Sequence, residues 1–473
     1  MILASQFALR VQPNSNEAWF ADPPRNLLRH GHLGTTILSA EGTWLEGIDR
    51  HTYWAMPVDL LAQAAWYSLF GFSLLSMRLL SVAAGLGLVL AWFLFASQLL
   101  ANRTLALVAA GLLAVDVRLA RFAANGRMDA LCAFLGVTGL AAFLLLRTRS
   151  PRVAALAGHA GVVLSVLTHP CGMVYVLDLV VLQVLLDGWR PACKRWFWVL
   201  APYAVFGAAF GAWALQDWTS FVRQIGGNVS GIAGEFSGAE RFGGLTRPWA
   251  ALLQEMENRY FRSFGGWAAL AVLWTYAASV VWTLVRPAMR IDSRVRLLLM
   301  LAGIHFTFFW LFEGLKLTNY LVHLLPILAT LAVLAGRDFL EVRPRARIAF
   351  VAIVVVLQVT AAFQELRGSS MRTAYLPVVD LLQRHPGLTV TGPAEFAFAV
   401  GFEGALRDDL RLGYYSGRRP DLFITNGWQR DWLERADKRE PAVARAIRQK
   451  LKSEFREIYR NSDYVVWKRV AVH

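Results

Sequence analysis

The chain has 473 residues, of which 56% are hydrophobic and 17% are charged, and its formal net charge is +15. Such a composition excludes a disordered chain, a coiled coil and a small disulfide-rich protein. Basic charge alone is compatible with nucleic-acid binding, but basic charge on so apolar a chain is typical of inner-membrane proteins with arginine-rich cytoplasmic loops. We therefore predict a multi-pass protein of the bacterial cytoplasmic membrane that contacts lipid and no nucleic acid.

The N-terminal segment MILASQFALR is apolar but too short to cross a bilayer, and it lacks the basic region of a signal peptide. A long outward loop, 10–72, follows it. We expect a further helix to precede this loop in the natural reading frame. Within the loop, residues 23–30 are predicted to form a short helix ended by Gly31, and residues 57–70 an interfacial helix.

Ten apolar segments are predicted to cross the membrane, because a bilayer core requires roughly 17 to 25 apolar residues in a helix. They are 79–102, 104–115, 130–146, 153–168, 172–187, 196–215, 263–285, 297–312, 317–336 and 348–364. The segment 104–115 is the shortest. With a preceding helix the total would be eleven.

Charge in the short connections orients these segments, since Lys and Arg in short loops stay in the cytoplasm. Alternate connections contain fifteen basic residues against four. Residues 10–72, 216–262 and the C-terminal tail therefore face outward. Without segment 104–115, later arginine-rich loops would lie on the wrong side.

Two domains are predicted. Residues 1–363 form a transmembrane module, and its outward loop 216–262 contains a Gly-rich flap at 226–244 followed by a helix from Pro248 to Phe264. Residues 364–473 have strand-like runs at 388–391, 421–425 and 463–467 and a helical stretch near 440–460. The predicted fold class is an all-α polytopic membrane protein with interfacial helices and a small C-terminal α/β domain on the outer face.

Ionisable residues at the outer membrane surface are the candidates for chemistry, because charges there are retained mainly for function or pairing. Three places contain them, namely Asn16 with Glu17, Arg127 with Asp129, and Lys316 with Tyr320. The three cysteines and the scattered histidines have no metal-ligand spacing, so neither a metal nor another cofactor is predicted.

Several motifs in residues 14–336 together resemble one family. They are SNEAWFADPPRNLLRHGHLGT, YWAMP, FGFSLLSMRLLS, RMD and KLTNYLVHLLP. The chain resembles the GT-C superfamily of polyprenyl-phosphate-sugar glycosyltransferases, in particular the branch of the protein O-mannosyltransferases and the lipid A aminoarabinose transferase.

The resemblance implies inverting transfer of a hexosyl or pentosyl group from a lipid phosphate to a hydroxyl of a lipid, glycan or protein in an outward-facing cavity. A carboxylate of the first loop would accept the hydroxyl proton, and fixed cations would bind the phosphate. The family's Asp-Glu pair falls on Asn16 and Glu17. Since Asn cannot accept a proton, either Glu17 is the base with Asp129 as second carboxylate, or Asn16 orients the acceptor while Asp129 supplies the carboxylate, or the chain is inactive. We favour Glu17.

A second departure lies in YWAMP, where Ala55 and Met56 replace two charged residues of the aminoarabinose branch, which argues against the lipid A reaction. His51 and Tyr53 are the polar groups nearby. The resemblance then assigns substrate binding to a larger set, which comprises Arg127, Lys316, Tyr320, His51, Tyr53, Arg259 and Arg262.

Each candidate also has a structural interpretation. Glu17 and Asp129 can cap helices, Lys316 and Tyr320 can be interfacial side chains, and Arg259 and Arg262 can contact lipid headgroups. For Asp178, inside a span, Arg78 is the predicted partner. As a whole, the chain can alternatively be a secondary transporter or flippase, although the inverted repeats and broken helices typical of such proteins are not evident.

Overall fold

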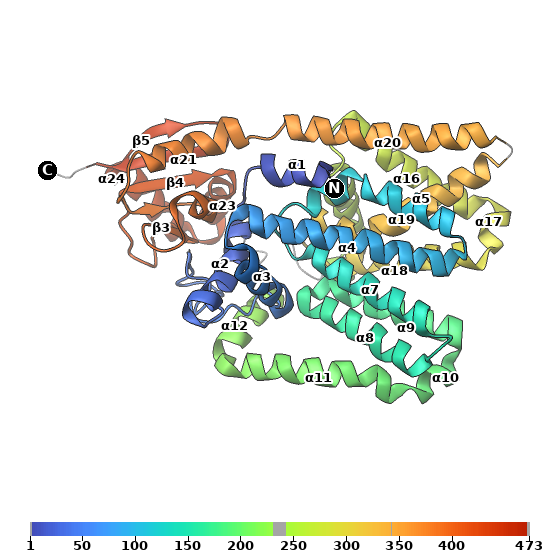
Figure 1. The fold of residues 1–473 in the computed structure, drawn as a ribbon. Helices are drawn as coiled ribbons and strands as arrows, with labels where there is room; N and C mark the ends of the chain where they lie inside the picture. The colour runs from blue at the N-terminus through green and yellow to red at the C-terminus, as the bar shows by residue number, and fades with distance from the viewer. Residues whose placement is uncertain (1, 230–242, 342, 471–473) are drawn as a thin grey trace.

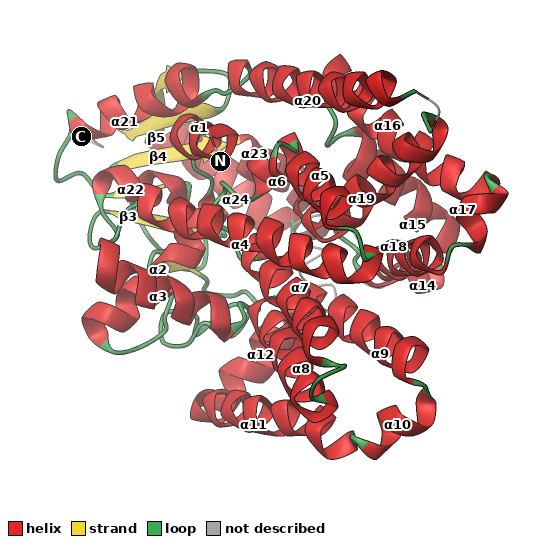
Figure 2. Cartoon of the chain, turned by 45° about the vertical axis from the view of Figure 1, so that its right-hand side comes forward, coloured by secondary structure: helices red, strands yellow, loops and turns green. Residues whose placement is uncertain are grey.

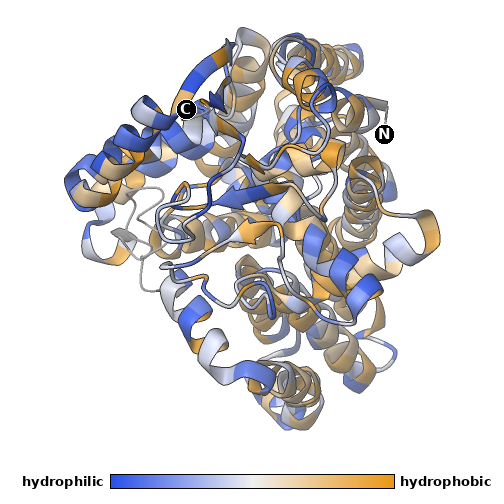
Figure 3. Cartoon of the chain, turned by 90° about the vertical axis from the view of Figure 1, so that its left-hand side faces the viewer, coloured by the Kyte–Doolittle hydropathy of each residue, from blue (hydrophilic) through white to orange (hydrophobic). Residues whose placement is uncertain are grey.

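The computed structural model describes residues 2–229, 243–341 and 343–470. A bundle of long helices carries a small sheet at one end (Figures 1 and 2). The predicted fold class, a polytopic helical membrane protein with a small C-terminal α/β part, is confirmed. Seen from the sheet end, hydrophilic stretches gather in the elements nearest the viewer, in front of the largely hydrophobic bundle helices (Figure 3).

Nine helical segments of the described chain are long and apolar enough to cross a membrane. They contain α4 (Leu74–Leu100), α7 (Asp129–Leu146), α8 (Pro151–Thr168), α9 (Met173–Asp187), α11 (Trp196–Ala214) with α12 (Trp218–Val229), α16 (Trp267–Val285), α18 (Ser293–Phe312), α19 (Leu321–Phe339) and α20 (Pro344–Arg367). Nine of the ten predicted segments coincide with these helices. The tenth, 104–115, is α5 (Arg103–Ala114), whose twelve residues extend about 18 Å and do not match a bilayer core of roughly 30 Å.

Helix α19 is the centre of the bundle, buried from Leu321 to Gly336 and packed against α5, α16 and α18. The basic connections α10 (Trp189–Lys194) and α17 (Pro287–Ile291) lie at the end of the bundle opposite the sheet (Figure 1). This arrangement is the one that the charge asymmetry predicts. Asp178 pairs with His305 at 2.7 Å and not with Arg78, so the predicted partner was wrong.

The first loop forms more helix than predicted. The N-terminal run is α1 (Ile2–Arg10), which packs against α4, α20 and the short α6 (Val117–Phe122). Helix α2 (Ser15–His30) begins at Asn14 with a capping box and ends at Gly31, whose φ is +77°. The prediction began this helix at residue 23, whereas the helix begins earlier and runs through Pro23 and Pro24. Helix α3 (Pro57–Phe70) has the predicted bounds.

The sheet has six strands in the order β1-β3-β2-β4-β6-β5. They are β1 (Leu38–Ser39), β2 (Val390–Thr391), β3 (Leu406–Asp409), β4 (Leu422–Asn426), β5 (Phe455–Arg460) and β6 (Tyr464–Arg469). The first four in spatial order are parallel, and β6 pairs antiparallel with β4 and β5. The predicted strands at 388–391, 421–425 and 463–467 are β2, β4 and β6.

Helices surround this sheet and complete the outer part of the molecule. They are α21 (Leu376–Gln383), α22 (Ala397–Val400), α23 (Gly427–Arg439) and α24 (Pro441–Glu454). The predicted domain boundary at 363/364 falls inside α20 and stays a prediction. Strand β1 belongs to the first loop, residues 10–72, so the sheet is built from both predicted domains.

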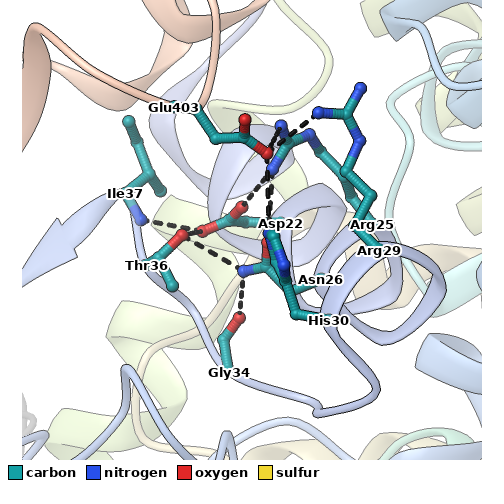
Figure 4. A network of polar contacts seen from close by, with 9 residues as sticks. All are labelled: Asp22, Arg25, Asn26, Arg29, His30, Gly34, Thr36, Ile37 and Glu403. Atoms are coloured by element: carbon teal, nitrogen blue, oxygen red, sulfur yellow. Dashed lines mark hydrogen bonds and ion pairs between the residues drawn. The ribbon is translucent and has the colours of Figure 1, made fainter.

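A polar network ties the first loop to the C-terminal part (Figure 4). Asp22 accepts hydrogen bonds from Thr36 and from the N–H of Ile37, which fixes the entry into β1. Arg25 and Arg29 of α2 both pair with Glu403. These two arginines lower the pKa of the Glu403 carboxyl to about 2. The loop and the sheet therefore form one packed unit.

The loop predicted at residues 216–262 contains α14 (Gly243–Thr246), α15 (Pro248–Gln254) and a π-helical turn at Glu255–Phe261. These elements match the helix predicted from residue 248. Most of the predicted Gly-rich flap, residues 230–242, lies outside the described residues.

Candidate active site

A cavity of about 1400 Å³ lies between the bundle and the sheet. Its bundle-side wall comes from α6, the α6–α7 connection and the turns that precede α9 and α19. Its sheet-side wall comes from α2, the first loop and the loops after β2, β3 and β4. Described residues from the α10 and α17 end of the bundle do not line it.

Arginines dominate the bundle-side wall. Helix α6 begins at Asp116, whose carboxylate accepts the N–H groups of Arg118 and Leu119. Arg118 and Arg121 of this helix share the carboxylate of Glu365, each at 3.0 Å. Two guanidinium groups thus share one carboxylate at this part of the wall.

Arg127 adds a third guanidinium group to this wall. Its Nε lies 2.9 Å from Oδ2 of Asp129, the first residue of α7. Asp129 is fully buried, does not line the cavity, and has one oxygen without a hydrogen-bond partner. The predicted neighbours thus lie together, but Asp129 reaches the cavity only through Arg127.

Asn16 and Glu17, the predicted site residues of the first loop, lie in two different environments. Asn16 lines the cavity, whereas Glu17 is fully buried behind it. Both oxygens of Glu17 bind Arg78, at 2.7 and 2.8 Å, and one also accepts the N–H of Asn14. The assignment of Glu17 as general base is therefore corrected, because its lone pairs serve an ion pair and a helix cap away from the cavity.

Lys316 and Arg259 do not line the cavity, which corrects their assignment to phosphate binding. Lys316 is 2% exposed and has φ +51°, and its Nζ donates to the carbonyls of Phe309 and Trp310 at the end of α18. Burial lowers the pKa of its ammonium group, an effect that nearby Glu255 opposes. Arg259 binds Glu255, Glu313 and the carbonyl of Leu317. The side chains of Lys316 and Arg259 thus stabilise the turn before α19.

Tyr320 and Arg262 do line the cavity. The Tyr320 hydroxyl lies 3.2 Å from Nε2 of His169, and Nδ1 of that histidine accepts the N–H of Cys171. Nε2 therefore carries the proton in the neutral ring and donates to Tyr320. Arg262 is mostly exposed and pairs with Glu257 at 3.0 Å.

His51 and Tyr53 lie away from the cavity, which corrects their assignment to substrate binding. Their rings stack at 5.5 Å, and the Tyr53 hydroxyl donates to the carbonyl of Trp213 and accepts the N–H of Asp217. The polar groups of this motif join the first loop to α11 and α12.

The sequence analysis missed the sheet-side wall. It holds Glu395 and Asp408, together with Asn426 at the end of β4. Burial raises the pKa of both carboxyls, that of Asp408 to about 8. A strand-like signal could have located Asn426, but Asp408 lies in the segment LRDD, which has no apolar alternation.

No family model matches the chain, and no curated protein matches it in sequence. Solved structures do match in fold. ArnT from Cupriavidus metallidurans bound to undecaprenyl phosphate has a TM-score of 0.65 at 15% identity, over 100% of this chain and 96% of that one. The archaeal oligosaccharyltransferase AglB from Archaeoglobus fulgidus, in complex with an inhibitory peptide and a dolichol-phosphate, has a TM-score of 0.55 at 11% identity, over 93% of this chain and 71% of that one. The chain therefore shares its fold with these two proteins, which belong to the GT-C superfamily that its motifs resemble.

Proposed function

We propose that this protein is a glycosyltransferase that moves a hexose or pentose from a polyprenyl-phosphate donor to an acceptor hydroxyl, with inversion at the anomeric carbon. The observation that carries the proposal is the arginine-rich wall of a large cavity within a fold shared with ArnT, which was solved bound to undecaprenyl phosphate. The proposed location is the outer face of the bacterial cytoplasmic membrane.

The arginine wall suits a lipid-phosphate leaving group. As the bond between the anomeric carbon and the phosphate oxygen breaks, the electron pair stays on the phosphate and its negative charge grows. Arg118, Arg121 and Arg127 bring three guanidinium groups to this wall, where two of them share one carboxylate, that of Glu365. Prearranged cations at this point stabilise the transition state, and we propose that they do so with neither a metal nor another cofactor.

The acceptor hydroxyl attacks from the face opposite the phosphate and loses its proton to a base. Asn16 stands where the family has a carboxylate, and we propose that its amide orients the acceptor. Asp129 holds Arg127 in place and is a positioning residue. The proton acceptor is then one of the carboxylates that line the cavity on its bundle side, Glu313 or Glu365.

The alternative functions make different demands. A transporter needs a path to the opposite face, whereas the described lining residues all lie at the sheet end of the bundle. An inactive relative would gain activity from a restored carboxylate, so sharply increased transfer by Asn16→Asp would favour that alternative.

The test uses the full chain in nanodiscs, with undecaprenyl phosphate for binding and a labelled polyprenyl-phosphate sugar for transfer. We expect the Arg118→Gln/Arg121→Gln variant to bind undecaprenyl phosphate at least about tenfold more weakly, because two charged contacts are lost. Arg147→Gln, which breaks an arginine–carboxylate pair with Asp187 away from the cavity, is the matched control. Undiminished binding by the double variant, or no transfer from any polyprenyl-phosphate sugar, would refute the proposal.

A further inference from the structure

Four tryptophans converge on the sheet-side wall of the cavity. Trp19, Trp44, Trp54 and Trp428 all line it, and all pack against one small apolar cluster around β1 and the end of β3. Trp19 and Trp54 meet edge to face, with ring centroids 6.3 Å apart. The wall therefore presents several aromatic rings to the cavity.

Polar atoms without partners lie among these aromatic rings. Nε1 of Trp44 and Nε1 of Trp54 are buried and have no hydrogen-bond partner. Oδ1 of Asp408, a residue that is only 1% exposed, also has no hydrogen-bond partner. Its other oxygen accepts the indole N–H of Trp19 at 3.0 Å and the N–H of Ala394 at 3.1 Å. Buried polar groups are normally paired, so two unpaired donors and one unpaired acceptor beside a cavity point to a ligand.

The topology places these groups where sheets of this kind bind ligands. Strands β1, β3, β2 and β4 run parallel, and the residues that follow their carboxyl ends line the cavity. Helix α23 begins at the same edge, where Asn426 forms its capping box. In open sheets with parallel strands, ligands bind outside the carboxyl ends of the strands.

We propose that this wall binds the acceptor and that the acceptor is a glycan. The inference rests on the proposed function and names the substrate class of the same cavity. A sugar ring offers apolar C–H faces to the tryptophan rings and hydroxyl groups at its edge. Those hydroxyls accept from the two indole N–H groups and form a hydrogen bond with Oδ1 of Asp408. An acyl chain would leave all three polar atoms unpaired.

The environment of Asp408 adds to this interpretation. Burial, reinforced by the charge of Glu395, raises its pKa to about 8, so the carboxyl group is mostly protonated at neutral pH. A protonated carboxyl both donates and accepts hydrogen bonds, and a sugar hydroxyl does the same. The group can then bind a neutral acceptor without a charge to desolvate.

The test measures binding of the full chain in nanodiscs to an array of bacterial surface oligosaccharides, with a serine- and threonine-containing peptide array beside it. Trp44→Phe and Trp54→Phe remove the unpaired N–H groups and keep an aromatic ring. Asp408→Asn keeps one oxygen for Trp19 and Ala394 and replaces Oδ1 by an amide. Trp467→Phe is the matched control, because its indole N–H is also buried and unpaired but lies outside the cavity.

We expect one or a few related glycans to bind, at least tenfold more weakly to the two tryptophan variants and unchanged to Trp467→Phe. Asp408→Asn should bind them with little loss, because its amide still donates at the position of Oδ1. Undecaprenyl phosphate binding should not change in any of them, which separates this inference from the proposed function. Absence of glycan binding, equal binding by all variants, or loss of peptide binding in the cavity variants would overturn it. So would weaker binding of undecaprenyl phosphate, since the wall would then serve the donor.

Discussion

Arg78 connects the N-terminal helices α1 and α2 to the bundle. It is 2% exposed, and it donates to Glu17 through two nitrogens and to the carbonyls of Ala8 and Val11 at 2.8 Å each. One side chain of α4 thus joins the end of α1 to the start of α2. A buried ion pair whose members are fully hydrogen-bonded is costly to break, because the remaining charge stays buried without its partner.

This geometry predicts that the main effect of Glu17→Gln is a lower stability of the folded chain, and not a direct loss of the transfer reaction. Leaving Arg78 buried without its carboxylate should cost roughly 3 to 5 kcal/mol. The measurement is the thermal unfolding midpoint of the purified chain in detergent, with Asn16→Ala as the control, since Asn16 lies at the cavity surface. An unchanged midpoint together with lost transfer would restore Glu17 as the base.

Asp408 predicts a pH dependence of stability. Its pKa is about 8 in the folded chain against 3.8 for an ordinary aspartate, so between these values the folded state binds more protons than the unfolded state. Stability contributed by this group is therefore full at low pH and is lost as pH rises toward 8.

Replacing the Asp408 carboxyl by an amide removes this loss of stability at higher pH. We expect Asp408→Asn to stabilise the chain more at pH 8 than at pH 5.5, by up to about 3 kcal/mol in the difference between the two conditions. Unfolding midpoints of both proteins at the two pH values provide the measurement. No difference between the two conditions would mean that Asp408 is already ionised in the folded chain at pH 5.5.

The elements show where local sequence patterns suffice and where they fail. Helix α3 has its predicted bounds because Pro57 starts it, Gly71 follows it and apolar residues recur between them. Helix α2 was predicted too short, since tertiary packing overrides two internal prolines. Strand β1 was missed because two residues carry no periodic signal and their partner strand lies far along the chain.

The candidate site divides in the same way. Asn16, Arg127 and Tyr320, which the sequence analysis selected because each lies in a motif predicted to face outward, all line the cavity. Asp408 was not selected, because it meets Trp19 across 389 residues of sequence. Only the pairing of β1 with β3 brings these two residues together, and no local pattern specifies it.

Strand β1 therefore predicts a mechanical link between the first loop and the sheet. Asp408 donates its N–H to the carbonyl of Ile37, and Leu410 donates to Ser39. Ser39→Pro removes a backbone donor and introduces a ring beside β3, where Ser39→Ala would keep the strand. We expect at least about tenfold faster amide exchange at residues 408 and 410, with strand β6 unaffected. Undiminished protection at these two amides would show that β1 does not hold β3.

At the scale of the whole molecule, the distribution of basic charge and the arrangement of the elements both distinguish two ends of the bundle. The basic connections around α10 and α17 lie at one end of the bundle, and the sheet and the cavity lie at the other (Figure 1). Because basic short loops stay in the cytoplasm, the sheet end is predicted to face outward. A donor with a long polyprenyl chain could then present its sugar at the outer surface while its tail stays in the bilayer.

The native cysteines allow this orientation to be tested directly. Cys193 in α10 is exposed, whereas Cys132 and Cys171 are buried. In right-side-out spheroplasts we expect a membrane-impermeant maleimide to label Cys193 only after permeabilisation, since α10 belongs to the end with the basic loops. The matched variant Cys193→Ser/Ser453→Cys moves the exposed thiol to α24 at the sheet end and should be labelled without permeabilisation. The reverse pattern would invert the orientation and place the cavity, with its lipid-phosphate donor, on the cytoplasmic side.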